Sequence, residues 1–380
     1  MERLGKQILL FDGGMGSELV KRGFSNVCPE DLNVTNPDVI VEIHQSYIDA
    51  DFITTNTFGL NRLKYRGQFD LAQVTACAIE NARKIGKYIF FDIGPTGKLL
   101  KPLGTLDFDT AYDTFREMVE LSRDKVDGYI LETFSDLYEL KAALLAVKEN
   151  SDKPVFATMT FDKNGRTLTG TTPEIMVAFL EKMGVNALGI NCSLGPDELS
   201  DIVLRLTTVS HTPILLQPNR GIPRLVNGES VYDLSAEEFA KKMKEYVQMG
   251  VSILGGCCGT NPDFIHSIAP LREQPVVKIT LQNRYAIFSY AKLVYPDEET
   301  YIRSYTIDMD ISPDECEDAA YEILDLIDDG AKVVEIVTNA IAPATLRSFL
   351  ETVQSLTSVP LTLVSDDEEI QKAFKRYYNG

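Results

Sequence analysis

The chain has 380 residues, which is long for a single typical domain and suits a barrel of about 250 residues followed by a smaller unit. Its hydrophobic content of 44% indicates a sizeable core, and no apolar run reaches the ~18 residues that a membrane span requires. A net charge of −19 argues against nucleic acids and anionic membranes as partners, because both are bound mainly through Lys and Arg.

The N-terminal stretch and the cysteines indicate the compartment. The stretch MERLGKQILLFDGG contains neither a signal-peptide apolar region of useful length nor a small-residue cleavage site. The six cysteines are sparse for this length and lack the spacing of a disulfide framework, as is typical of a reducing compartment. We therefore expect a soluble, cytoplasmic protein in which a cysteine cluster serves metal binding or catalysis.

Apolar, β-branched runs alternate with amphipathic stretches along most of the chain. The helical stretches include 72–86, 136–150 and 236–250, where apolar residues recur at three- and four-residue spacing. The predicted strands are 8–12, 52–58, 88–94, 128–134, 155–161, 187–193, 214–219 and 252–258. Eight strand–helix units in about 270 residues predict an α/β fold, a (β/α)8 TIM barrel.

Polar and thiol groups stand at the carboxyl end of each predicted strand, where such barrels keep their active sites. In chain order these residues are Asp12 with the GGMG that follows it, Asn56, Asp92, Glu132, Thr160 with Asp162, Asn191 with Cys192, Gln217 with Asn219, and Cys257 with Cys258. We expect these side chains to converge on one rim of the barrel.

Three cysteines of this rim form a candidate metal site. Cys192 ends the sixth strand, and Cys257 and Cys258 end the eighth, so all three can meet over the barrel mouth. A disulfide between adjacent cysteines would be strained. Three thiolates bind Zn²⁺ well and leave a fourth position open, as in catalytic zinc sites. The alternative is a set of inert buried thiols, because cysteine is among the most buried residue types.

Other kinds of active site are poorly represented. The three histidines, His44, His211 and His266, stand in helical stretches or a loop and not at a strand end, so a histidine base is not expected. Residues 11–19, FDGGMGSEL, lack the spacing of a phosphate-binding glycine loop and contain no lysine. Cys28, Cys77 and Cys316 fall outside the rim, and we interpret them as structural.

A second, smaller α/β unit is predicted after the barrel. Residues 1–275 form the barrel, 276–300 a linker, and 301–380 the small unit, which has 16 acidic and 6 basic side chains. Its predicted strands are 304–310, 332–338 and 361–365, and its predicted helices are 314–330, 343–357 and 366–380. Because three parallel strands leave two edges open, we expect this unit to dock on the barrel or on a second copy, as in a homo-oligomer.

Six motifs together resemble the homocysteine S-methyltransferase family, in the same order and at the same spacing. They are FDGGMGSEL at 11–19, TTNTFG at 54–59, IGPTG at 93–97, LETF at 131–134, GINCS at 189–193 and GGCCGT at 255–260. Residues 94–108 and 158–174 are most similar to the N-terminal homocysteine-binding module of cobalamin-dependent methionine synthases. The segment after 300 resembles about the first third of a pterin-binding barrel, with GAKVVEI at 330–336 similar to its second strand.

This resemblance implies an enzyme that forms methionine by methyl transfer to the thiol of homocysteine. It implies Zn²⁺ held by Cys192, Cys257 and Cys258, with the homocysteine sulfur as fourth ligand. The homocysteine pocket would comprise Asp12, Gly14, Met15, Gly16, Thr55, Asn56, Glu132 and Asn191. The substrate carboxylate suits the amides of the 14–16 turn, and its ammonium suits Glu132 or Asp12.

Structural alternatives exist for these residues. Asp12 would merely cap a helix, Glu132 would be a surface charge, and Thr55 and Asn56 would hold barrel loops together.

The methyl donor is the open part of this interpretation. No cobalamin-binding segment follows the barrel in the sequence, so methylcobalamin would arrive on a separate corrinoid protein. The alternatives are S-methylmethionine or betaine as donor, or a catalytically idle protein that binds zinc and homocysteine. Folate binding by the C-terminal segment is not expected, because the opening motif of folate barrels is absent around 300–308.

Overall fold

The structure is a computed structural model of the whole chain. It describes residues 2–221, 224–226, 229–231, 233–279, 281, 285–297, 299–307, 311–312 and 315–380. Parts of three predicted segments lie outside the described residues: 308–310 of the strand at 304–310, residue 314 of the helix at 314–330, and 280, 282–284 and 298 of the linker.

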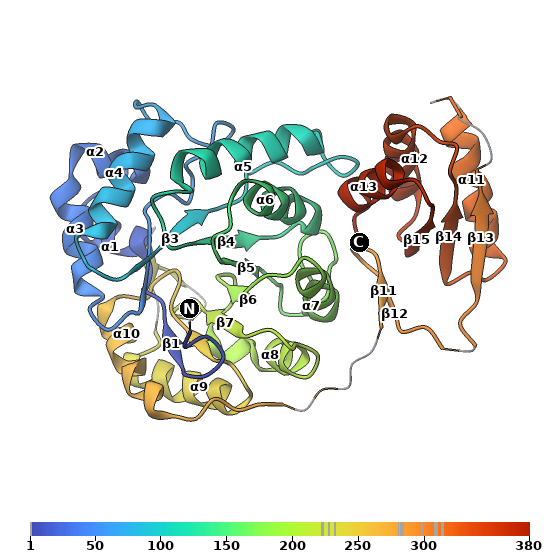
Figure 1. Cartoon of the computed structure of the whole chain (residues 1–380). Coiled ribbons are helices and arrows are strands. Elements are labelled where there is room, and N and C mark those ends of the chain that lie inside the picture. The colour runs from blue at the N-terminus through green and yellow to red at the C-terminus, as the bar shows by residue number, and fades with distance from the viewer. Residues whose placement is uncertain are drawn as a thin grey trace.

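Eight parallel strands form the barrel, with helices around them (Figure 1). The strands are β1 (Leu9–Leu10), β2 (Phe52–Thr54), β3 (Tyr88–Ile93), β4 (Gly128–Phe134), β5 (Val155–Met159), β6 (Ala187–Asn191), β7 (Ile214–Gln217) and β10 (Ile253–Leu254). Their order is β1-β10-β7-β6-β5-β4-β3-β2, and a bridge between Phe11 and Phe52 joins the two ends of the sheet. The predicted fold class is confirmed.

The outer helices follow the strands in alternation. They are α1 (Met15–Lys21), α2 (Leu32–Thr35), α3 (Pro37–Ser46), α4 (Leu71–Arg83), α5 (Phe108–Ser122), α6 (Leu137–Asn150), α7 (Pro173–Lys182), α8 (Ser200–Thr207), α9 (Ala236–Gln248) and α10 (Pro262–Ile268). A short hairpin, β8 (Arg224–Val226) and β9 (Glu229–Val231), precedes α9. No described helix combines the length and the apolar character that a membrane crossing needs.

All of the barrel strands except β4 are shorter at their carboxyl ends than predicted. The run at 252–258, for example, gives only Ile253–Leu254, because the following residues leave the sheet and enter a loop. The polar residues expected at the strand ends therefore lie in the loops or last strand positions around the barrel mouth.

Aromatic side chains fill the barrel interior below this mouth. The buried rings of Phe11, Phe52, Phe90 and Phe156 form one cluster, with centroids 4.7–5.9 Å apart. Because side chains alternate along a strand, the next inward positions are two residues further on. Two residues beyond the buried Phe52, Phe90, Ile130, Phe156 and Leu215 stand Thr54, Asp92, Glu132, Thr158 and Gln217, and Asn191 stands four residues beyond Ala187. A polar layer thus covers an aromatic floor, which we call the phenylalanine floor.

The C-terminal unit has its own sheet and core. Strands β13 (Ile302–Thr306), β14 (Val333–Val337) and β15 (Leu361–Val364) run parallel, with helices α11 (Glu315–Asp328), α12 (Pro343–Leu356) and α13 (Glu368–Tyr377). The predicted linker contains an antiparallel hairpin, β11 (Ile287–Phe288) and β12 (Leu293–Val294). We retain 1–275, 276–300 and 301–380 as the proposed division into domains.

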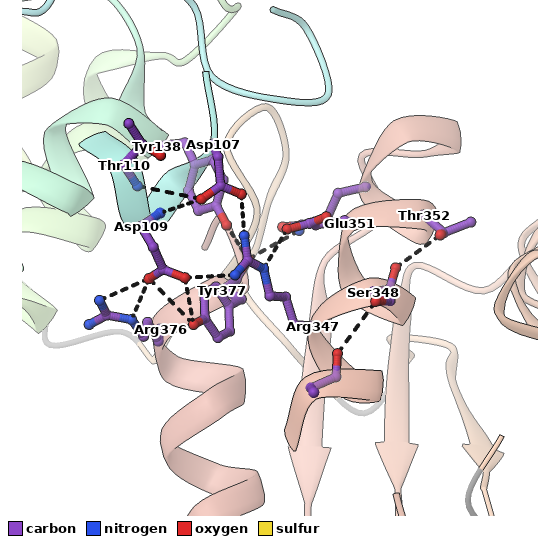
Figure 2. A network of polar contacts seen from close by, with 12 residues as sticks. Asp107, Asp109, Thr110, Tyr138, Arg347, Ser348, Glu351, Thr352, Arg376 and Tyr377 are labelled. Carbon is purple, nitrogen blue, oxygen red and sulfur yellow. Dashed lines mark hydrogen bonds and ion pairs between the residues drawn. The ribbon is translucent and has the colours of Figure 1, made fainter. Parts of the chain in front are cut away.

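The C-terminal unit docks on the barrel helices α5 and α6, beside the barrel wall (Figures 1 and 2). Arg347 of α12 pairs with Asp107 and Asp109 at the start of α5, at 2.6 Å for Asp109. Arg376 and Tyr377 of α13 also contact Asp109, at 3.0 and 3.1 Å. Partly buried charge-assisted contacts of this kind fix the orientation of two units.

Two buried side chains of α6 donate hydrogen bonds to backbone carbonyls at the C-terminal end of α13. The Tyr138 hydroxyl donates to the Tyr377 carbonyl at 2.9 Å, and the Lys141 ammonium donates to the Tyr378 carbonyl. The last carbonyls of a helix have no partner within the helix and carry partial negative charge, so these donors stabilise the docked arrangement.

Candidate metal and substrate site

Three thiols meet at the mouth of the barrel. Cys192 directly follows β6, and Cys257 and Cys258 lie in the loop after β10. Their Sγ atoms all lie within 4.8 Å of one another, and those of Cys192 and Cys258 are 3.8 Å apart. Cys258 is exposed, whereas the other two are partly buried, so the cluster is accessible from solvent.

The local backbone explains how these cysteines converge. Cys192 and Ser193 adopt left-handed conformations, with φ of 59° and 62°, so the chain turns away as soon as β6 ends. In the other loop, a Cβ atom at Gly256 would lie 2.4 Å from the Thr260 hydroxyl, so only glycine permits this turn. The Cys257 amide donates to the Pro218 carbonyl, which fixes the loop to the end of β7.

The thiols influence one another strongly. Contacts from Cys257 and Cys258 lower the pKa of the Cys192 thiol, because they stabilise its thiolate. Their contacts with Cys192 raise the pKa values of the Cys257 and Cys258 thiols. A site with one thiol that readily loses its proton and two further thiols beside it suits a soft metal cation.

The cluster fits the donor set of a zinc site. A tetrahedral Zn²⁺ with sulfur at about 2.3 Å separates its sulfur ligands by about 3.8 Å. The Cys192–Cys258 separation of 3.8 Å matches this value. Three cysteines supply three ligands, and the exposed side of the cluster leaves room for a fourth.

Glu132 and Asn191 lie beside the thiols. The β4–β5 register shifts between Leu131 and Phe134, and Thr133 has a φ of 63°; this bulge sets the direction of Glu132. The Asn191 amide donates to Glu132 at 3.3 Å and to the Thr133 hydroxyl at 2.7 Å, and lies 3.9 Å from the Cys257 sulfur. Burial, and next the Cys192 charge, raise the pKa of Glu132 to about 8.

Asp12 is buried but does not cap α1, so the capping alternative is wrong. Its carboxylate accepts from the Thr54 amide and hydroxyl, both at 2.8 Å, while Gly14 occupies the cap position without a side-chain bond. Burial raises the pKa of Asp12 to about 7.

The turn after Asp12 is tied to the cysteine loop. The Gly14 amide donates to the Thr260 hydroxyl at 3.2 Å, and that hydroxyl donates to the Cys257 carbonyl at 2.7 Å. Met15 is half-buried and Gly16 is exposed. The amides of the first helical turn, other than that of Gly14, therefore remain for a ligand.

Thr55 and Asn56 are buried and hold loops. The Thr55 hydroxyl accepts from the Asp92 amide at 3.0 Å, and the Asn56 amide group donates to the Pro29 carbonyl at 2.7 Å. These contacts are the loop-holding roles considered as the alternative, and substrate contacts of both residues stay a prediction.

Two charged residues near the mouth were not among the predicted site residues. Asp92 is 4% exposed, and its Oδ1 has no hydrogen-bond partner among the described residues. Lys64, in the loop after β2, places its ammonium 4.0 Å from the centroid of the Phe58 ring. The position of Asp92 at the end of a predicted strand marked it as a candidate. Nothing in the sequence marked Lys64, because a lysine in a loop belongs to no periodic pattern.

Comparison with known proteins places this site in a family. The model of the homocysteine S-methyltransferase family matches residues 9–271, which include the three cysteines. The chain belongs to the homocysteine S-methyltransferase family. Methionine synthases of Mycobacterium leprae (strain TN) and Mycobacterium tuberculosis (strain ATCC 25618 / H37Rv) are each 32% identical over 299 residues, covering 71% of this chain. The alignments cover 24% and 25% of those proteins, so this member spans about a quarter of their length.

Solved structures of the family share the barrel. The apo form of the homocysteine methyltransferase MmuM from Escherichia coli has a TM-score of 0.57 and 23% identity, over 70% of this chain and 95% of that one. The metallated form has a TM-score of 0.59 and 21% identity, over 70% and 96%. At these identities the similarity concerns the fold alone.

Proposed function

We propose that this homocysteine S-methyltransferase family member transfers a methyl group to the thiol of homocysteine and forms methionine, at a Zn²⁺ ion held by Cys192, Cys257 and Cys258. The observation that carries the proposal is the convergence of these thiols, with Sγ atoms within 4.8 Å, at the accessible mouth of the barrel. Membership of the family supports the choice of homocysteine.

The residues around the thiols would bind and orient the amino acid. Bound Zn²⁺ would lower the pKa of the homocysteine thiol and keep its sulfur nucleophilic at neutral pH. Glu132 would accept from the substrate ammonium, with Asn191 holding its carboxylate in place. In the turn of Gly14, Met15 and Gly16, the amides of Met15 and Gly16 would donate to the substrate carboxylate, because that of Gly14 is bonded to Thr260.

The remaining predicted residues would support this pocket. Asp12 would act close to the ammonium, while Thr55 and Asn56 would keep the loops around the mouth in place. In the transfer, a bond forms between the substrate sulfur and the methyl carbon. The bond from that carbon to the donor breaks, and its electron pair stays with the donor.

We propose methylcobalamin on a separate corrinoid protein as the donor. The support for a corrinoid donor is the 32% identity to methionine synthases over 299 residues. S-Methylmethionine and betaine are the alternative donors. We place the reaction in the cytoplasm, because reactive, unpaired thiols persist in a reducing compartment.

The test is methionine formation by the zinc-loaded protein with homocysteine and each donor in turn: free methylcobalamin, S-methylmethionine and betaine. We expect turnover with methylcobalamin, at least a 100-fold loss in Cys257→Ser, and no change in Cys77→Ser, whose thiol lies in α4 away from the site. Methionine formation with S-methylmethionine and with neither of the other two donors would contradict methylcobalamin as the donor. Full activity of zinc-free Cys257→Ser would overturn the metal site.

A further inference from the structure

The acceptors available to a substrate ammonium are limited at the barrel mouth. A buried ammonium has three N–H donors, and each needs an acceptor. Asp12 already receives two hydrogen bonds from Thr54, one on each oxygen. One Glu132 oxygen receives the Asn191 amide. Each of these two carboxylates has already used part of its acceptor capacity, so a third acceptor close by would complete the binding of the ammonium.

Asp92 offers a further acceptor. It lies on β3 opposite Ile130 of β4, so it stands on the strand next to Glu132, in the polar layer above the phenylalanine floor. Its side chain is 4% exposed, and its Oδ1 is buried without a hydrogen-bond partner in the part of the chain that the structure describes. Such an unsatisfied carboxylate oxygen is uncommon in native proteins and indicates a partner that binds there.

The charges around Asp92 also favour a cation. Burial raises its pKa well above the ordinary value, and the Glu132 charge raises it further; Lys64 opposes both effects. Lys64 is itself partly desolvated above the Phe58 ring, and burial lowers its pKa. One partly desolvated lysine thus faces several carboxyl groups, and a bound ammonium would add a second positive charge.

We propose that Asp92 is a substrate-binding residue, which accepts a hydrogen bond from the ammonium group of the bound amino acid beside Glu132. The inference rests on the proposed function and assigns a further contact within the same site. A hydrogen bond to a charged group of this kind changes affinity on the order of 10- to 100-fold.

The test compares two thiols on the zinc-loaded full chain by isothermal titration calorimetry. Homocysteine carries the ammonium, and 4-mercaptobutanoate has the same thiol and carboxylate without it. In Asp92→Asn we expect homocysteine to bind on the order of 10- to 100-fold more weakly, with unchanged affinity for 4-mercaptobutanoate. Asp152→Asn, at an exposed loop position before β5, is the matched control and should change neither affinity.

Equal weakening of both thiols, or no weakening of either, would overturn the role of Asp92. Zinc content and thermal melting of the variant show whether it is folded and loaded. If Asp92→Asn does not fold, Asp92→Ser removes the same carboxylate and is held to the same outcomes. A wild-type protein that binds zinc but not homocysteine would contradict the proposed function itself, whereas an Asp92 variant with full homocysteine affinity contradicts only this inference.

Discussion

Individual residues at the mouth differ in how far the sequence reveals them. Cys192, Cys257 and Cys258 were predictable as a cluster, because each follows a buried strand and parallel strands end on one rim. The left-handed conformations of Thr133 and Cys192 were not, because non-glycine residues adopt them only when surrounding contacts impose them. The burial of His44 was also not predictable: it lies in α3, and its side chain is fully buried.

Glu139 of α6 provides a pH-dependent contribution to stability. Its carboxyl is 3% exposed and accepts from the Thr96 amide at 2.7 Å and hydroxyl at 2.6 Å. Burial raises its pKa from 4.5 to about 7. Between pH 4.5 and pH 7 the folded state therefore retains a proton that the unfolded state has lost. This contribution to the free energy of unfolding is complete below pH 4.5 and is lost as the pH rises through 7.

Replacement of Glu139 by Gln should flatten this dependence. We expect the free energy of unfolding of the wild type to fall by on the order of 3 kcal/mol more than that of Glu139→Gln between pH 4.5 and pH 8. Urea unfolding across this range measures it, with the exposed Glu80→Gln as control. Parallel profiles for wild type and Glu139→Gln would contradict the assignment.

At the level of elements, periodicity predicted all eight barrel strands and their alternation with helices. The strand ends were overestimated, because residues such as Gly255 and Cys257 continue the apolar run while their backbone already turns into a loop. The hairpin of β11 and β12 was missed, because strands of two residues are too short to show an alternating pattern.

The phenylalanine floor is an element of stability that also supports the site. Phe156 is one of its four rings, with ring centroids 4.7 Å from Phe90 and 5.9 Å from Phe11 and Phe52. We expect Phe156→Ala to lower the free energy of unfolding by about 3–5 kcal/mol, because the barrel cannot collapse around the cavity. Urea denaturation measures the loss, and Tyr321→Ala, at an exposed aromatic of α11, is the control. A loss for Phe156→Ala no larger than that of the control would show that the floor is not a packed core.

At the level of the whole molecule, the sequence predicted that the C-terminal unit packs on another surface, but not which surface it uses. An open three-stranded sheet predicted that the unit must pack on something. The docking surface depends on ion pairs of Arg347 with Asp107 and Asp109. In the sequence these three residues cannot be distinguished from other charged residues of helices. The docked unit lies against the outer helices α5 and α6, beside the barrel wall (Figure 2).

Removal of Arg347 tests this docking. Arg347→Met loses the contacts with Asp107, Asp109 and Glu351 and leaves carboxylates facing an apolar chain. We expect faster proteolytic cleavage within 276–300 and a separate, lower unfolding transition in calorimetry, with zinc content unchanged. Lys372→Met, which removes an exposed pair with Glu369, should leave both measurements as in the wild type. A single transition at the wild-type temperature for Arg347→Met would contradict a docking role.

The central claim is that three cysteines hold zinc with a position open for the thiol of homocysteine. X-ray absorption at the zinc edge of the loaded protein measures it directly, with and without homocysteine. The account predicts three sulfur ligands at about 2.3 Å in the free protein and four when homocysteine is bound. An unchanged sulfur number on addition of saturating homocysteine would contradict it.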